Sequence, residues 1–201
     1  MEFRQLYGMK ERPSLLGFGC MRLPLLPGGE RGDIDYPRAE AMIDEAVKNG
    51  VNYFDTAYGY LDGQSEIFVG KTMKKYPRES FYLATKLPMG QIDSYEKGVE
   101  IFNRQFEKLQ VDYIDFYMFH GINRETFDEK ILKFGLLDEM LRMKEEGSAI
   151  SASPSTAAMR ILNISCNTGN GISARSSTIT LTNTARQAAP AWTMRPQKAF
   201  L

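Results

Sequence analysis

The chain has 201 residues, is 43% hydrophobic and 25% charged and carries no formal net charge, which is ordinary for a soluble globular protein with a sizeable core. Its two cysteines, Cys20 and Cys166, set neither a disulfide framework nor the spacing of metal ligands, so we expect a cytoplasmic protein without a metal site. No apolar run approaches the length of a membrane span, and the first residues lack the basic and apolar regions of a signal peptide.

The N-terminal part of the chain predicts a hairpin, a loop and a helix. Residues 3–6 and 15–18 have the character of two short strands, and a Gly-, Pro- and charge-rich stretch then indicates a surface loop. Asp35 can cap a helix, and Pro37 suits its first turn. Apolar residues recur at helical spacing, at Ala39, Met42, Ile43, Ala46 and Val47. Asn49–Gly50 ends this helix.

Three later apolar runs each end in a chemically useful residue. The run that starts at Val51 delivers Asp55 and then Tyr60, the run 81–86 ends in Lys86, and the run 113–119 ends at His120, the only histidine of the chain. An aspartate at the end of a buried strand is costly to bury alone, so we expect it to have a cationic partner, and Lys86 can serve.

Helices are predicted between and after these strands, at 66–75, 94–109 and 127–146, so the pattern is that of βαβ units with a parallel sheet. Functional groups at the carboxyl ends of strands fit either a TIM-type barrel or a doubly wound sheet. Pattern alone does not separate the two. The N-terminal hairpin favours the barrel, as does Gly17-x-Gly19 without the third glycine of a dinucleotide fingerprint.

Four motifs resemble those of the aldo/keto reductases, in order and at sensible spacing over about residues 2–147. They are GFGCMRLP at 17–24, DTAYGY at 55–60 with Ser65-Glu66, ATKLP at 84–88, and LQVDYIDFYMFHG at 109–121. The resemblance implies an α/β fold that is the N-terminal half of a (β/α)8 barrel, with a hairpin at its floor and about four βα units. It also implies an oxidoreductase that reduces an aldehyde or ketone with NADP(H) or NAD(H).

Matched by motif, the catalytic tetrad of the family falls on Asp55, Tyr60, Lys86 and His120. The resemblance also implies that the turn Gly19-Cys20-Met21, together with Asp55, lies near the cofactor. This chemistry needs a proton for the oxygen of the carbonyl substrate, and Tyr60 can give one if the Lys86 ammonium stabilises its phenolate. Asp55 would hold Lys86, and His120 would polarise the carbonyl. The choice between NADH and NADPH stays open, as do the substrate and the oligomeric state.

Other interpretations remain for these residues and for the chain. Taken singly, the aspartate and lysine could be a structural ion pair, and the histidine could simply be hydrogen-bonded. One alternative function is a non-catalytic module of the same fold that binds a nucleotide or a partner. Another is a half-barrel interaction protein whose basic tail contacts nucleic acid or an acidic partner, although the first 147 residues show no basic aromatic patch.

The segment 148–201 breaks the pattern. It contains no Asp or Glu but five basic residues, whereas the first 147 residues hold 20 basic and 25 acidic groups. We expect this segment to be irregular or disordered. It could be a flexible basic tail, a linker or a product of translation out of frame. The last alternative is compatible with back-translation, because a shifted frame permits an acidic, aromatic sequence typical of the family. A four-strand half-barrel leaves parallel edges unpaired, so we expect impaired activity in this truncated chain.

Overall fold

A computed structural model describes residues 1–5, 12–146 and 178–179 of the chain. Its centre is a sheet in the order β1-β2-β3-β4-β5. The strands are β1 (Phe18–Gly19), β2 (Tyr53–Asp55), β3 (Tyr82–Pro88), β4 (Phe116–His120) and β5 (Thr178–Ile179). The first four are parallel in chain order, as expected of consecutive βα units, and β5 pairs antiparallel with the end of β4.

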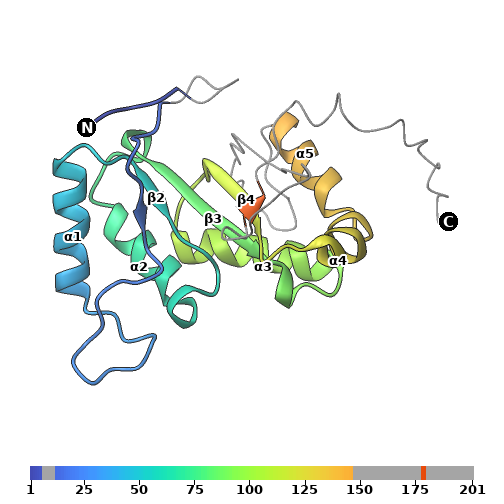
Figure 1. The fold of residues 1–201 in the computed structure, drawn as a ribbon, viewed down its shortest axis with the longest axis horizontal. Helices are drawn as coiled ribbons and strands as arrows, with labels where there is room; N and C mark the ends of the chain where they lie inside the picture. The colour runs from blue at the N-terminus through green and yellow to red at the C-terminus, as the bar shows by residue number, and fades with distance from the viewer. Residues whose placement is uncertain (6–11, 147–177, 180–201) are drawn as a thin grey trace.

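The helices follow one another along this sheet, from α1 at the left of Figure 1 to α4 and α5 in its right half. They are α1 (Tyr36–Lys48), α2 (Gln64–Met73), α3 (Tyr95–Leu109), the one-turn α4 (Arg124–Thr126) and α5 (Leu136–Glu146). Short 3₁₀ segments lie at η1 (Tyr60–Gly63), η2 (Arg78–Ser80) and η3 (Met89–Gln91), and a π-helix, η4, spans Phe127–Leu132. No helix in the described ranges has the length and apolar character that a membrane crossing requires.

The first predicted helix is confirmed together with its physical causes. The Asp35 side chain accepts a hydrogen bond from the backbone N–H of Arg38, and Pro37 lies in the first turn. Ala39 and Ile43 are fully buried, and Gly50 follows the helix with a φ of +84°. This glycine is needed because side chains rarely adopt that left-handed conformation.

The last predicted helix is not continuous. The expected span 127–146 is divided into η4 and α5, with Gly135 at a φ of +68° between them. A residue in the left-handed region interrupts the hydrogen-bond ladder of a right-handed helix, so the glycine separates the two segments. Because of this break, the axis of α5 does not have to continue the axis of η4.

The predicted hairpin appears as an antiparallel bridge between Phe3 and Ser14, with residues 6–11 outside the described part. The second strand of this hairpin was predicted at 15–18, but the residue that bridges to Phe3 is Ser14, and Phe18 belongs instead to the parallel strand β1. Of the segment 148–201, only β5 is described, so the expected irregular tail otherwise lies outside the described residues.

The two faces of the parallel sheet are buried differently. The face toward the helices belongs to a large apolar core that includes Phe54, Leu83 and Phe119. The opposite face carries a smaller cluster of Ala84, Phe116 and Met118, with Tyr53 and Tyr82 packed against it. Because side chains alternate along a strand, Asp55, Lys86 and His120 continue this second face to the carboxyl ends of their strands.

Candidate active site

An ion pair joins the ends of two neighbouring strands. Lys86 Nζ lies 2.6 Å from Asp55 Oδ1 and donates a second hydrogen bond of 2.7 Å to the carbonyl oxygen of Thr56. The side chain of Lys86 is 5% exposed and that of Asp55 is 30% exposed. A buried ammonium needs such partners, because desolvation of an unpaired charge is costly. The cationic partner expected for Asp55 is therefore Lys86.

Tyr60 stands beside this pair. Lys86 Nζ lies 4.8 Å from the centre of the Tyr60 ring. The residues that follow, Leu61, Asp62 and Gly63, have φ values of 52°, 53° and 84°. A non-glycine residue in this region costs on the order of 1–2 kcal/mol, and the burial of Leu61, only 4% exposed, offsets part of this cost. The left-handed turn fixes the direction in which the chain leaves Tyr60.

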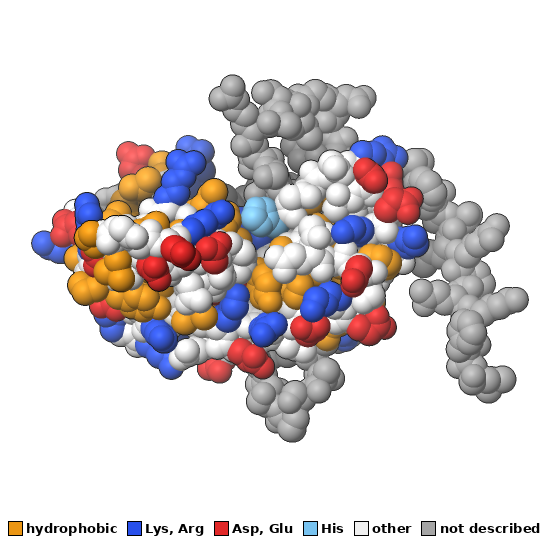
Figure 2. Space-filling view, turned by 90° about the horizontal axis from the view of Figure 1, so that it is seen from below, with side chains coloured by type: hydrophobic (Ala, Val, Ile, Leu, Met, Phe, Trp, Pro, Cys, Tyr) orange, Lys and Arg blue, Asp and Glu red, His pale blue; other side chains and the backbone are white. Residues whose placement is uncertain are grey.

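His120 completes the group at the end of β4. Its ring centre lies 5.7 Å from that of Tyr60, with the two rings nearly perpendicular. Burial lowers the pKa of His120, and the Lys86 ammonium lowers it further, whereas the Asp55 carboxylate acts in the opposite direction. A lowered pKa favours the neutral imidazole near pH 7, which can still donate one hydrogen bond. In Figure 2 the single histidine of the chain is visible in pale blue near the middle of the face seen from below.

The turn predicted to lie near a cofactor is partly open. A Cβ added to Gly19 would meet nothing within 4 Å, and Met21 is 44% exposed. Cys20 is fully buried, and burial raises the pKa of its thiol. Its backbone N–H donates to the carbonyl oxygen of Asp55, and its own carbonyl oxygen accepts from Ser65 Oγ. Gly19, which pairs with Asp55 in the sheet, thus has open space where a side chain would stand, while Cys20 ties the turn to the fold.

Sequence reasoning missed the role of Ser65. A serine just before an expected helix could serve as its cap, but α2 begins at Gln64 and has Gly63 at its N-cap position. The Ser65 hydroxyl instead lies fully buried, 2.8 Å from Thr56 Oγ1 and 2.8 Å from the Cys20 carbonyl oxygen. These bonds join the start of α2 to the residues that follow β1 and β2, and so support the ends of both strands. Ser65 and Cys20 are 45 residues apart in the sequence, so no local sequence pattern could predict their hydrogen bond.

Comparison with known proteins identifies the family. The aldo/keto reductase family model matches residues 15–164, which extends past Gly147. The chain is 30% identical to L-galactose dehydrogenase of Arabidopsis thaliana over 152 residues, covering 73% of this chain and 46% of that protein. It is 33% identical to the NADH-specific methylglyoxal reductase of Escherichia coli over 110 residues, covering 44% of this chain and 32% of that protein.

A solved structure gives the same result. An aldo-keto reductase from Bacillus halodurans, in its holo form, superposes with a TM-score of 0.60 and 30% identity, covering 80% of this chain and 48% of that one. The chain therefore spans about half the length of such relatives or less. The four parallel strands and their helices correspond to the N-terminal part of the (β/α)8 barrel, as predicted. The chain belongs to the aldo/keto reductase family, a family of oxidoreductases.

Proposed function

We propose that this chain carries the catalytic tetrad of an NAD(P)H-dependent carbonyl reductase, formed by Asp55, Tyr60, Lys86 and His120. The observation that supports the proposal most directly is the convergence of these four side chains from β2, η1, β3 and β4 on one end of the sheet. Family membership supports the reaction class. The open space at Gly19, which pairs with Asp55 in the sheet, and the exposed side chain of Met21 fit a bound cofactor there.

In the proposed mechanism, the nicotinamide cofactor supplies the hydride, and the chain manages the proton and the charge. Tyr60 gives its phenolic proton to the carbonyl oxygen of the substrate. A phenol has a reference pKa of about 10 and is a weak acid at neutral pH, so the ammonium of Lys86 is needed to stabilise the phenolate. Asp55 holds that ammonium in place through the 2.6 Å ion pair.

His120 is proposed to act on the substrate. Its neutral imidazole donates a hydrogen bond to the carbonyl oxygen, which polarises the carbonyl and directs this oxygen toward Tyr60. The ring centres of Tyr60 and His120 lie 5.7 Å apart, so both side chains stand near the same part of the site. A substrate oxygen between them would receive both bonds.

The test is turnover with a small aldehyde. Because one relative is an NADH-specific methylglyoxal reductase, we propose methylglyoxal as the first substrate, with NADH and NADPH compared by their fluorescence on binding and their absorbance during turnover. Tyr60→Phe should reduce turnover by a factor of about 10² to 10⁴, the usual size of general acid catalysis, and leave cofactor binding unchanged.

Tyr58→Phe is the matched control. The Tyr58 ring lies 3.9 Å from Lys108 Nζ, so removal of its hydroxyl should leave turnover intact. Equal turnover of wild type and Tyr60→Phe would refute the assignment. Cofactor binding without turnover in the wild type would favour the second candidate, a non-catalytic cofactor-binding module, which is supported by the coverage of only about half of the relatives' length.

Although the family model matches as far as residue 164, we also propose that the partial barrel ends near residue 147 and that residues 148–201 are read in a shifted frame. The absence of Asp and Glu from this segment supports the proposal. Sequencing of the DNA around codons 146–154 tests it. One intact frame, with no family-like coding in the adjacent frame, would refute it.

A further inference from the structure

Behind the proposed active site, a cluster of polar side chains lies fully buried between the sheet and two helices. Its members are Glu66 of α2, Thr85 of β3, Gln105 of α3 and Tyr117 of β4, each 0% exposed. Buried polar groups are costly unless they are hydrogen-bonded. Nothing in the proposed mechanism uses these four, so their contacts need another explanation.

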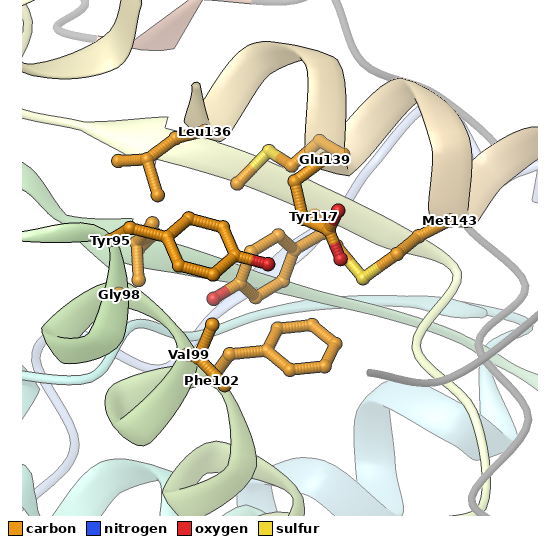
Figure 3. Close-up of a pocket in the computed structure, with 10 residues that line it drawn as sticks. Tyr95, Gly98, Val99, Phe102, Tyr117, Leu136, Glu139 and Met143 are labelled. Carbon is orange, nitrogen blue, oxygen red and sulfur yellow. The ribbon is translucent and has the colours of Figure 1, made fainter. Parts of the chain in front are cut away.

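The four side chains satisfy one another. Glu66 Oε1 accepts a hydrogen bond of 2.7 Å from Thr85 Oγ1 and another of 2.7 Å from Gln105 Nε2. The hydroxyl of Tyr117 donates to Gln105 Oε1. Figure 3 shows Tyr117 lying against the residues of α3, among them Val99 and Phe102. These contacts fix the orientation of the amide, because a reversed amide would set its oxygen against the Glu66 carboxylate.

The same amide reaches the active-site strand. Gln105 Nε2 also lies 3.2 Å from the backbone carbonyl oxygen of Lys86. Side chains alternate along a strand, so Thr85 points toward the helices and Lys86 points to the opposite face. Gln105 therefore contacts the backbone of β3 from behind, at the residue whose ammonium is presented in front.

Glu66 holds the same amide nitrogen from the side of α2. Hydrogen bonds to a charged acceptor are stronger than those between neutral groups. Burial raises the pKa of Glu66, but its two hydrogen-bond donors and Lys108, whose Nζ lies 3.4 Å from Oε2, act against that rise. The Gln105 amide nitrogen thus lies within hydrogen-bond distance of both Glu66 Oε1 and the carbonyl oxygen of Lys86.

We infer that Gln105 is a positioning residue for Lys86: held by Glu66 and oriented by Tyr117, it fixes the β3 backbone so that the ammonium faces Asp55, Tyr60 and His120. The inference rests on the proposed function. Two bonds of 2.6 and 2.7 Å define the place of Lys86 Nζ, and a displacement of about 1 Å at a catalytic group can cost a factor of about 10² in rate.

Gln105→Met tests the inference in the full chain, since methionine has a similar length and cannot make these hydrogen bonds. His120 is the only histidine, so one NMR titration reports its pKa without any need for turnover. The Lys86 ammonium lowers that pKa. A displaced ammonium should therefore let the pKa of His120 rise, and kcat for methylglyoxal should fall by about 10- to 100-fold with KM changed less than about twofold.

Ile101→Ala is the matched control, one helical turn earlier on α3 and 1% exposed. It should destabilise the fold by removing buried apolar volume, yet leave the pKa of His120 and kcat at their wild-type values. If Gln105→Met does not fold, Tyr117→Phe takes its place. It removes only the hydroxyl that orients the amide and should shift both measurements in the same direction by less.

An unchanged pKa of His120 in folded Gln105→Met, or in folded Tyr117→Phe where that variant replaces it, would overturn the inference and leave Gln105 a purely structural residue. So would a pKa shift of equal size in Ile101→Ala. If the wild type shows no turnover, the proposed function fails, whereas the titration of His120 still decides whether Gln105 positions Lys86.

Discussion

Two ion pairs lie at opposite ends of the same parallel sheet. At the ends where β3 and β4 begin, Arg78 pairs with Asp115 at 2.5 Å, and their side chains are 20% and 6% exposed. At the ends where β2 and β3 finish, Lys86 pairs with Asp55 at 2.6 Å, and the carboxylate is 30% exposed. The two pairs have the same kind of chemistry and nearly the same length.

Their surroundings differ. Arg78 contacts the rings of Phe81 and Tyr113 and donates to the carbonyl oxygens of both residues. Asp115 also accepts a hydrogen bond from the backbone N–H of Leu83. These contacts tie the starts of two strands together. Around Lys86, by contrast, the neighbouring rings carry a phenol and an imidazole. What makes an ion pair a candidate for catalysis is therefore the neighbouring reactive groups, here a phenol and an imidazole, and not the pair itself.

The largest expected effect comes from Arg78→Met. Removal of one partner leaves a buried, unpaired carboxylate, which typically costs about 3–5 kcal/mol of the free energy of unfolding. Burial already raises the pKa of Asp115, and Arg78 opposes that rise. A carboxyl group whose pKa is higher in the folded than in the unfolded protein contributes more to the free energy of unfolding at low pH. This contribution is lost as the pH rises through the folded pKa. The destabilisation should therefore be larger at pH 7 than at pH 4, as measured by urea unfolding.

An exposed pair provides the control for this prediction. Arg124 contacts Asp128 at 2.6 Å, but its side chain is 90% exposed. Surface pairs contribute little to stability, so Arg124→Met should leave the urea midpoint almost unchanged at both pH values. Equal losses of stability in the two variants would contradict the view that burial decides the effect.

A smaller effect is expected at the other pair, in the pKa of His120. Lys86→Met should raise this pKa because it removes a nearby positive charge, and Asp55→Asn should lower it because it removes the opposing negative charge. Since the folded pKa is below the unfolded value, the contribution of His120 to stability is lost as the pH falls through the folded pKa.

NMR titration of this single imidazole measures both shifts. Arg78→Met serves as the control and should not change the pKa of His120, because Arg78 lies at the other end of the strands. A shift in Arg78→Met as large as that in Lys86→Met would show that the two ion pairs are not independent.

How much of this could be predicted depends on the range of the interactions. Asp55 and His120 are the last residues of their strands, as the short apolar runs predict, and parallel strands bring these ends to one edge. The prediction that the second run ends at Lys86 is wrong, because β3 continues to Pro88. The first helix follows from Asp35, whose capping role depends only on residues close in sequence. The tetrad roles came from the resemblance, since single residues at strand ends also fit a structural ion pair.

The buried polar cluster could not be predicted in this way. Periodicity assigns glutamate and glutamine to the outward face of a helix, yet Glu66 and Gln105 are both fully buried and bond across 39 residues. Their environment exists only after α2 and α3 pack together. The division of the last helix at Gly135 was missed for a different reason: a glycine within an otherwise periodic stretch is compatible with a continuous helix.

The left-handed turn Leu61–Asp62–Gly63 has one more consequence. Glu66, whose carboxylate lies behind the sheet, follows Tyr60, whose phenol lies in front of it, by only six residues in the sequence. Three of the residues that link them form this turn. Residues inserted here to redesign substrate preference would therefore disturb the rear support of Lys86 at the same time. Protein engineers should treat the link between β2 and α2 as fixed framework and make their changes in other loops.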